Sequence, residues 1–369
     1  MNNLPVPAAL RNIGLILFLL AIVALLVTLL HLQIKGFEHL IIENPSSEWF
    51  FSILSNPFAA ILFGVLLTIL VRSSSIVITV IAIMVAAGFP FEAGIFMLMG
   101  ANVGTTIPNT MVSAFPSCDV NDHCRMMSIS SMHYFNSMLA FGIFFPLQLS
   151  LDYLGKSSRA IVEWLGYQHN FLPPLNGDVT FAFLDPITAF INLSDFPISI
   201  YLVLFLIIVL LMRLFFIVLH LIFDPFIIGK LTKQVESPNQ CNNRVLSTGI
   251  WTSTLLQSSS STLYLLLPLA KKMNCSSRDI YPLILGVNVG TCFTTIFLAL
   301  MLNSELALAI GLAHLIYNVI TLLVFNYLPL LKEFPIMASR HLACSSYEGE
   351  EEEFTTNYLW YDMSEKKKD

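Results

Sequence analysis

The chain has 369 residues, of which 56% are hydrophobic and only 11% are charged. Soluble domains usually carry about 25% charged residues, so this composition and the mean hydropathy of +0.76 exclude an ordinary soluble protein and indicate an integral membrane protein. Of the formal net charge of −6, −4 lies in residues 338–369, and the near-neutral remainder offers no basic face for nucleic acid.

The first apolar run, Ile13–Leu30, is long enough to cross a bilayer, which takes about 20 helical residues. We expect this helix to be retained, because it is longer than the apolar core of a signal peptide and no cleavage site follows it. An amphipathic link, Gln33–Trp49, leads from it to Asn56-Pro57, where the next apolar run begins.

A cluster of serines interrupts that second apolar run. Val71–Thr79 reads Val-Arg-Ser-Ser-Ser-Ile-Val-Ile-Thr, and the apolar arm that follows, Ile76–Ala87, is short for a full crossing. A single serine on an intact helix can bond the carbonyl one turn back, whereas three in succession at membrane depth favour an opened backbone. We therefore predict a broken helix that lines a polar cavity, with its two arms forming a re-entrant hairpin.

A second interruption is predicted at Gly100–Thr106, which reads Gly-Ala-Asn-Val-Gly-Thr-Thr and follows the apolar run Phe91–Met99. The next crossing, Met126–Leu149, carries His133 and Asn136. His133, like His314 in the second half, is interpreted as a structural hydrogen-bonding group, the alternative being a proton carrier.

The second half of the chain repeats these landmarks in the same order. A lead helix is predicted at Ile200–Phe223. A second serine cluster, Gln257–Thr262, follows it, and its first serine lies 185 positions after Ser73. The segment Gly286–Thr291 matches the first Gly-x-Asn-x-Gly-Thr segment at an offset of 186, and His314 and Asn318 follow. An amphipathic link follows the first lead helix, whereas a polar connection follows the second. This difference favours an inverted repeat with a solute site near the bilayer midplane.

The predicted fold class is an all-α polytopic membrane protein with two inverted-topology repeats, each with a re-entrant helical hairpin and broken helices. Residues 1–149 form the first repeat with its lead helix, and residues 200–335 form the second. Residues 150–199, with Pro173-Pro174 and Asn176-Gly177, are predicted to be an extramembrane loop. Residues 336–369 lack apolar runs and are predicted to be a disordered cytoplasmic tail.

Two kinds of ion site follow from this pattern. The N–H groups at the start of a broken helix attract anions, whereas exposed carbonyls with Ser, Thr and Asn oxygens suit a partly dehydrated sodium ion. Candidate anion ligands are Ser73, Ser74, Ser75, Ser258, Ser259 and Ser260, and candidate cation ligands are Asn102, Thr105, Asn288, Thr291 and Thr294. The alternative is that these residues only pack helices, although their duplication favours a site. Six cysteines without metal-binding spacing predict no metal beyond sodium and no cofactor.

At these motifs the chain resembles the type II sodium-dependent phosphate cotransporters. That family carries Gln-Ser-Ser-Ser twice, each copy followed by a Gly-x-Asn-x-Gly-Thr segment and a His-containing helix. The similarity covers Asn56–Gly88, Gly100–Pro146 and Thr254–Leu331. It implies symport of inorganic phosphate with sodium by alternating access, in a plasma membrane and at its apical face. It also adds Gln257 to the phosphate ligands, and Thr110 and Asp119 to the sodium ligands.

The sequence departs from the family pattern at several of these positions. Arg72 replaces the first Gln, and Tyr134 replaces an Asp of electrogenic members, so electroneutral transport is expected by analogy. Further departures are Ile76, Pro116, Ser137, Val287 and Phe293. Because the charged tail follows directly on Pro335, we expect a C-terminally shortened member. The alternative is a relative with lost or altered transport that keeps a binding or regulatory role.

Arg72 has three possible roles, since an arginine inside a membrane is usually paired or faces a cavity. Its guanidinium can clamp two phosphate oxygens, its charge can replace one sodium ion, or its side chain can snorkel to the membrane surface. A further functional hypothesis, an intramembrane Ser/His hydrolase, needs one activated serine rather than two clusters, and no Gly-x-Ser-x-Gly motif is present.

Overall fold

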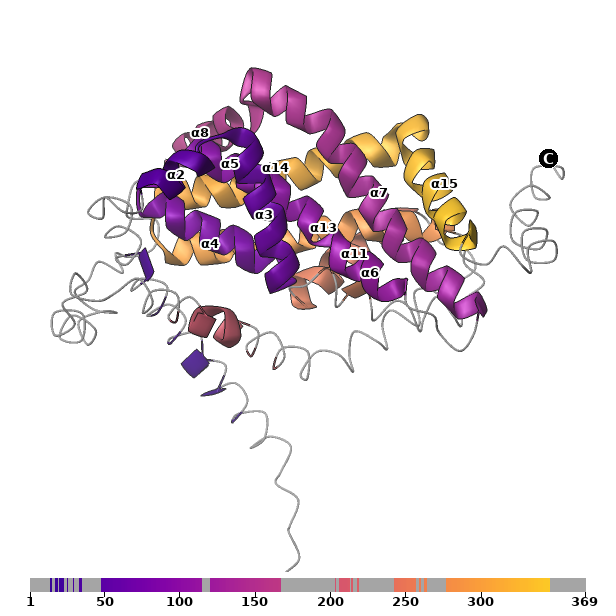
Figure 1. Ribbon diagram of the computed structural model, residues 1–369. Coiled ribbons are helices and arrows are strands. Elements are labelled where there is room, and N and C mark those ends of the chain that lie inside the picture. Colours follow the sequence, from indigo (N-terminus) through magenta and orange to yellow (C-terminus); the bar gives the residue numbers. More distant parts are fainter. Residues whose placement is uncertain are drawn as a thin grey trace, which may run out of the picture.

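The computed structural model describes residues 48–114, 120–166, 242–256 and 277–345, together with single positions and short pieces within 14–34, 203–218 and 259–263. All of its described elements are helices, as predicted (Figure 1). Three of them are long and apolar enough to cross a membrane, Met126–Leu151, Ile280–Met301 and Glu305–Tyr327. Most of the two predicted lead helices lies outside the described residues, but the positions described there are helical.

The first helices are separated by a break at the serine cluster. Helix α2 spans Glu48–Leu54 and α3 spans Pro57–Val71. Helix α3 ends because Arg72 adopts the left-handed conformation, with φ of 58°, and its N–H donates to the Thr68 carbonyl at 2.7 Å. Ser73 is extended, and α4 begins after it and spans Ser74–Ala86. The opened backbone predicted from the three serines is therefore confirmed.

The interruption predicted at Gly100–Thr106 is largely wrong. Helix α5 spans Phe91–Gly104 and continues through Gly100, and only Thr105 separates it from α6, Thr106–Ser113. Thr105 itself has near-helical angles, with φ of −66° and ψ of −23°. In the second half, α13 spans Ser277–Met301 and passes through the matching glycines without a break.

These glycines instead allow two pairs of helices to touch through their backbones. A Cβ atom added at Gly64 would collide with the Met97 carbonyl, and one at Gly100 would collide with the Ile61 carbonyl. Helices α3 and α5 therefore approach more closely than any larger side chain allows.

The same close contact occurs again between α11, Asn242–Leu256, and α13. There a Cβ at Gly249 would meet the Leu283 carbonyl, and one at Gly286 would meet the Leu246 carbonyl. Gly249 follows Gly64 by 185 positions and Gly286 follows Gly100 by 186, which are the offsets of the sequence repeat. The repetition read from the sequence is thus also a repetition of packing.

Two segments predicted to be irregular are helical. Part of the predicted loop forms α8, Tyr153–Trp164, which buries Leu154 and Val162 and packs against α14, Glu305–Tyr327. The start of the predicted tail belongs to α15, Pro329–Ser345, which packs against α7, Val120–Leu151. The predictions were wrong for these described parts, because short amphipathic helices precede the turn-rich and charged stretches. Residues 167–199 and 346–369 lie outside the described residues.

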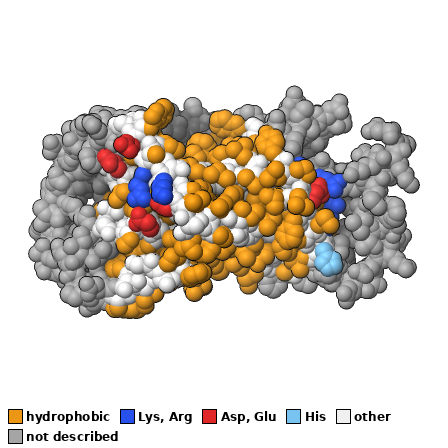
Figure 2. All heavy atoms as spheres, turned by 90° about the horizontal axis from the view of Figure 1, so that it is seen from above, with side chains coloured by type: hydrophobic (Ala, Val, Ile, Leu, Met, Phe, Trp, Pro, Cys, Tyr) orange, Lys and Arg blue, Asp and Glu red, His pale blue; other side chains and the backbone are white. Residues whose placement is uncertain are grey.

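The described part of the face seen in Figure 2 has a broad apolar area, with charged side chains on either side of it. On α3 the exposed residues Phe58, Leu62, Leu66 and Leu70 follow one another at four-residue intervals and are 51–78% exposed. A continuous apolar stripe of this kind is unfavourable in water and favourable in hydrocarbon. The surface agrees with an integral membrane protein.

Replacing Gly100 or Gly286 with Ala is expected to destabilise the protein by about 1–3 kcal/mol, because the new methyl group forces two backbones apart. The measurement is the thermal unfolding midpoint of each purified variant in detergent. Gly142→Ala is the matched control, since Gly142 is exposed on α7 and an added Cβ meets nothing within 4 Å. Equal midpoints for Gly100→Ala and Gly142→Ala would contradict the close backbone contact.

Candidate polar site between the two halves

The first serine cluster forms the N-terminus of α4. The Ser73 hydroxyl accepts a hydrogen bond from the Ile76 N–H at 3.4 Å, and its carbonyl accepts one from the Val77 N–H at 3.2 Å. The N–H groups of Ser74 and Ser75 have no partner within the helix, because the first N–H groups of a helix never do. This end of α4 is therefore suited to an anion.

The same serines are buried against the second half of the chain. Ser73, Ser74 and Ser75 are 9%, 5% and 1% exposed. The Ser75 hydroxyl donates to the carbonyl of Thr291 at 3.4 Å. Helix α4 lies beside α13 and α14 in Figure 1, and it packs against both. The first serine cluster thus contacts the second Gly-x-Asn-x-Gly-Thr segment.

The asparagines of both Gly-x-Asn-x-Gly-Thr segments also form contacts between the halves. Asn288 Oδ1 lies 2.8 Å from Nε2 of His133. Asn318 Nδ2 donates to Asn102 Oδ1 at 3.4 Å, and it also lies 3.0 Å from the carbonyl of His314. The imidazole of His133 thus joins α7 to α13 through Asn288.

Three further polar residues of α13 line this region, and sequence reasoning missed them. The Tyr281 hydroxyl donates to Asn136 Oδ1 at 2.7 Å, and Cys292 Sγ donates toward the His314 carbonyl at 3.5 Å. Thr295 Oγ1 lies 3.5 Å from Nδ1 of His314. Residues 281, 288, 292 and 295 recur at intervals of seven, four and three, which place them on one helix face. That polar periodicity was readable in the sequence.

Several buried polar atoms in the described part of the chain have no hydrogen-bond partner in the structure. They include Thr105 Oγ1, His133 Nδ1, Asn136 Nδ2 and His314 Nε2. Such atoms are rare in folded proteins, and those that occur are commonly satisfied by water or by a ligand. All four come from the segments and helices that the sequence repeat singles out.

The other predicted ligands are placed less centrally. Arg72 is exposed, and within the described residues it forms no ion pair. Thr110 lies at the contact between α6 and α7, where its hydroxyl is 3.1 Å from the Thr106 carbonyl and 3.3 Å from the Ser130 carbonyl. Thr294 and Ser259 are both buried. The predicted ligands outside the described residues are Asp119, Gln257, Ser258 and Ser260.

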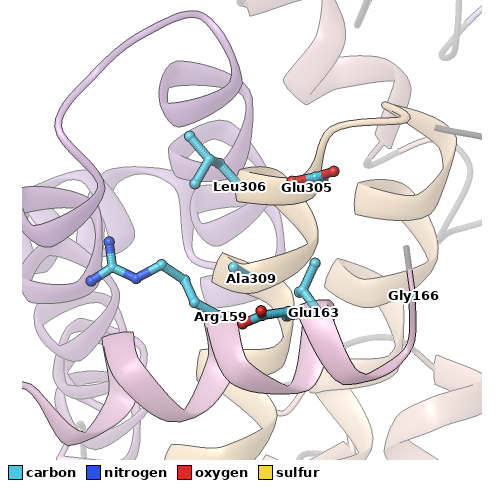
Figure 3. Close-up of a pocket in the computed structure, with 7 residues that line it drawn as sticks. Arg159, Glu163, Gly166, Glu305, Leu306 and Ala309 are labelled. Carbon is cyan, nitrogen blue, oxygen red and sulfur yellow. The ribbon is translucent and has the colours of Figure 1, made fainter. Parts of the chain in front are cut away.

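A surface cavity of about 380 Å³ lies elsewhere, between α8 and α14. Glu163 comes from α8, while Glu305, Leu306 and Ala309 come from α14, as Figure 3 shows. Its lining carries the carboxylates of Glu163 and Glu305 and one guanidinium, Arg159, which is paired with Glu92 and Asp152, and this balance of charge does not favour an anion. This cavity contains none of the ligands predicted from the serine and asparagine motifs.

Comparison with known proteins agrees with the motifs. The sequence model of a family described as Na+/Pi-cotransporter matches residues 25–162 and 222–327. The chain is 31% identical over 157 residues to sodium-dependent phosphate transport protein 2B of Homo sapiens, a stretch covering 42% of this chain and 22% of that protein. The same protein of Bos taurus is 31% identical over 145 residues, or 39% of this chain and 20% of the relative.

Sodium-dependent phosphate transport protein 2A of Ovis aries is 33% identical over 112 residues, which cover 30% of this chain and 18% of that relative. The aligned stretches therefore span only about a fifth of the length of each of these relatives. No solved structure matches the chain. The family match itself covers more than half of the chain, on both sides of the repeat. The chain therefore belongs to the Na+/Pi-cotransporter family.

Proposed function

We propose that this chain transports inorganic phosphate together with sodium, and that phosphate binds at the N-terminus of α4. The observation that carries the proposal is the helix break at Arg72–Ser73, which begins α4 at the serine cluster and places the Ser75 hydroxyl against Thr291 of the second half. The curated relatives are named as sodium-dependent phosphate transporters, and this name agrees with an anion site built from neutral donors.

Neutral donors suit a carrier better than fixed cations do. Hydroxyl and amide N–H groups can satisfy the phosphate oxygens with several hydrogen bonds, yet they add no full charge that would hold the anion permanently. Ser74 and Ser75 each supply a hydroxyl and an N–H that has no partner within the helix, at the start of α4. The second cluster, including buried Ser259, supplies the corresponding groups in the proposal.

Transport by alternating access is supported by the burial of the site. Because Ser73, Ser74 and Ser75 are at most 9% exposed, phosphate can reach them only when neighbouring elements move. Helix α4 packs against α5 of its own half and against α13 and α14 of the other, so a shift between the halves uncovers its N-terminus. We place the re-entrant hairpin of the first repeat at α3, the break and α4.

An inverted relation of the repeats is supported by reciprocal contacts. Asn102 of the first half bonds Asn318 of the second, while Asn288 of the second bonds His133 of the first. Reciprocal contacts between equivalent surfaces are what a two-fold axis produces. An axis in the membrane plane brings both broken helices to the same depth, which is where substrate sites of such transporters lie.

Sodium is assigned to the oxygens beside the serines. Asn102 and Thr105 from the first half, and Asn288, Thr291 and Thr294 from the second, are the ligands that we propose. The buried Thr105 hydroxyl has no partner, which agrees with a role toward an ion. Thr110 and Asp119 are assigned to sodium by the resemblance alone.

The setting of the proposed transporter is a plasma membrane, at its apical face, where exposed apolar residues such as those of α3 contact lipid. We propose that the transport cycle moves no net charge. This is favoured by Tyr134, which lies on α7 where electrogenic members carry an Asp. A relative with altered specificity or a regulatory role remains the alternative, because Arg72 and Val287 change the motifs.

Cells that express the chain are expected to take up labelled phosphate faster in sodium chloride than in choline chloride. The double variant Ser74→Ala, Ser75→Ala is expected to raise the half-saturating phosphate concentration roughly tenfold or more, since it removes two hydroxyl donors to a charged ligand. Ser157→Ala is the matched control, because Ser157 is exposed on α8. Equal uptake in the two salts would refute sodium coupling and favour the regulatory alternative.

Arg72→Gln separates the three roles of the arginine. Because Arg72 is exposed, we expect the half-saturating concentrations of phosphate and sodium to stay within about twofold of the parent, as for a snorkelling side chain. A rise of tenfold or more for phosphate would instead assign a clamp to the guanidinium. A steeper dependence on sodium would mean that the positive charge replaces one ion.

Voltage-clamp recording tests the electroneutral cycle. Addition of phosphate to cells that take it up is expected to evoke no steady current, since the family's acidic residue is replaced by Tyr134. A sustained inward current that requires both phosphate and sodium would show that net charge moves. The variant Tyr134→Asp, measured beside the parent, is expected to introduce or enlarge such a current.

A further inference from the structure

Two hydrogen bonds between the halves hold the two motif asparagines in corresponding ways. Asn288 Oδ1 lies 2.8 Å from Nε2 of His133, and Asn102 Oδ1 accepts from Asn318 Nδ2 at 3.4 Å. His133 lies on α7 and Asn318 on α14, the last long helix of the described part of each half. Each asparagine therefore contacts the helix that belongs to the other half.

The surroundings of these bonds leave the amides little freedom. His133 is fully buried, Asn318 is 3% exposed and Asn102 is 8% exposed. A hydrogen bond is stronger in such surroundings than at a water-exposed surface. An asparagine amide has an oxygen on one side and an NH2 group on the other, so a donor placed against Oδ1 fixes which way the group faces.

A second hydrogen bond joins the same two helices one turn further along α7 from His133. Asn136 follows His133 by three residues on α7, and its Oδ1 accepts from the Tyr281 hydroxyl of α13 at 2.7 Å. The two bonds together tie α7 to α13 at two successive positions. The imidazole is thereby held in register with Asn288.

We infer that His133 and Asn318 are positioning residues for sodium, each orienting the ligating asparagine of the opposite half. The inference rests on the proposed function, which assigns Asn102 and Asn288 to sodium. An amide oxygen has two lone pairs, so it can accept a hydrogen bond and ligate a cation at the same time. Outer partners that orient a ligand typically change metal affinity by about 10- to 100-fold.

A consequence of this arrangement is that ion binding and the contact between the halves depend on each other. Sodium bound to Asn288 favours the orientation that His133 also favours, so the ion stabilises the joined arrangement of α7 and α13. By linkage, a variant that loosens this arrangement weakens sodium binding to the same extent. Neither His133 nor Asn318 needs to touch the ion.

The experiment measures sodium binding without relying on transport. The unfolding midpoint of the purified full chain in detergent is recorded against sodium chloride concentration, with choline chloride holding the ionic strength constant. His133→Leu is expected to raise the half-saturating sodium concentration roughly tenfold. His133→Gln, which keeps a donor in place of Nε2, is expected to stay within about twofold of the parent. His341→Leu is the matched control, because His341 is exposed on α15.

A double-mutant cycle shows whether His133 acts through Asn288. In the Asn288→Ala background, His133→Leu is expected to change the half-saturating sodium concentration by less than about twofold, since the residue it orients is gone. An equal effect in both backgrounds, or none in the parent background, overturns the inference. If His133→Leu does not fold, Asn318→Ala with and without Asn102→Ala carries the same test for the other pair.

Phosphate uptake by the same variants separates this inference from the proposed function. A parent that is stabilised by sodium but takes up no phosphate refutes the proposed transport and leaves the positioning role in place. A parent that transports phosphate, with the same sodium dependence in His133→Leu, refutes the positioning role alone. If sodium chloride raises the unfolding midpoint of the parent no more than choline chloride does, the positioning role is overturned.

Discussion

The structure depends on the cost of leaving backbone polar groups without partners inside a membrane. Helices avoid this cost along their length, so an interruption survives only where protein covers it. At the break between α3 and α4, Arg72 turns its own N–H back to Thr68, and Ser73 caps the next helix with its hydroxyl and carbonyl. The second half of the chain packs against this region, where the Thr291 carbonyl accepts from the Ser75 hydroxyl. The site that we assign to phosphate is thus the place where backbone polar groups are most difficult to supply with partners.

Much of this arrangement could be read from the sequence, because the residues concerned have few other uses in lipid. Consecutive serines predicted the break at Ser73, and the offsets of 185 and 186 predicted a repeat, which recurs in the packing of Gly64 and Gly249. The glycines of the second motif were misread, since glycine marks both flexible breaks and close helix contacts. Only the position of the neighbouring helix decides between these, and it is a long-range property.

Helices α8 and α15 and the partners of the polar face of α13 escaped the sequence analysis for a different reason. Short amphipathic helices at the edge of an apolar protein carry a weak periodic signal, and turn residues nearby outweighed it. For α13, the pairing of Tyr281 with Asn136 joins residues 145 positions apart, which no local pattern encodes.

The glycine contacts have a mechanical consequence. Where two backbones touch without intervening side chains, as at Gly100 and Gly286, there is no layer of flexible atoms that could shear, so α3 with α5 and α11 with α13 each behave as one stiff lever. Any large displacement must then occur at the polar contacts between helices, where amide and hydroxyl groups can exchange hydrogen-bond partners at small cost. The protein is thus divided into rigid helix pairs and polar contacts that can rearrange, and these polar contacts include residues that we assign to ions.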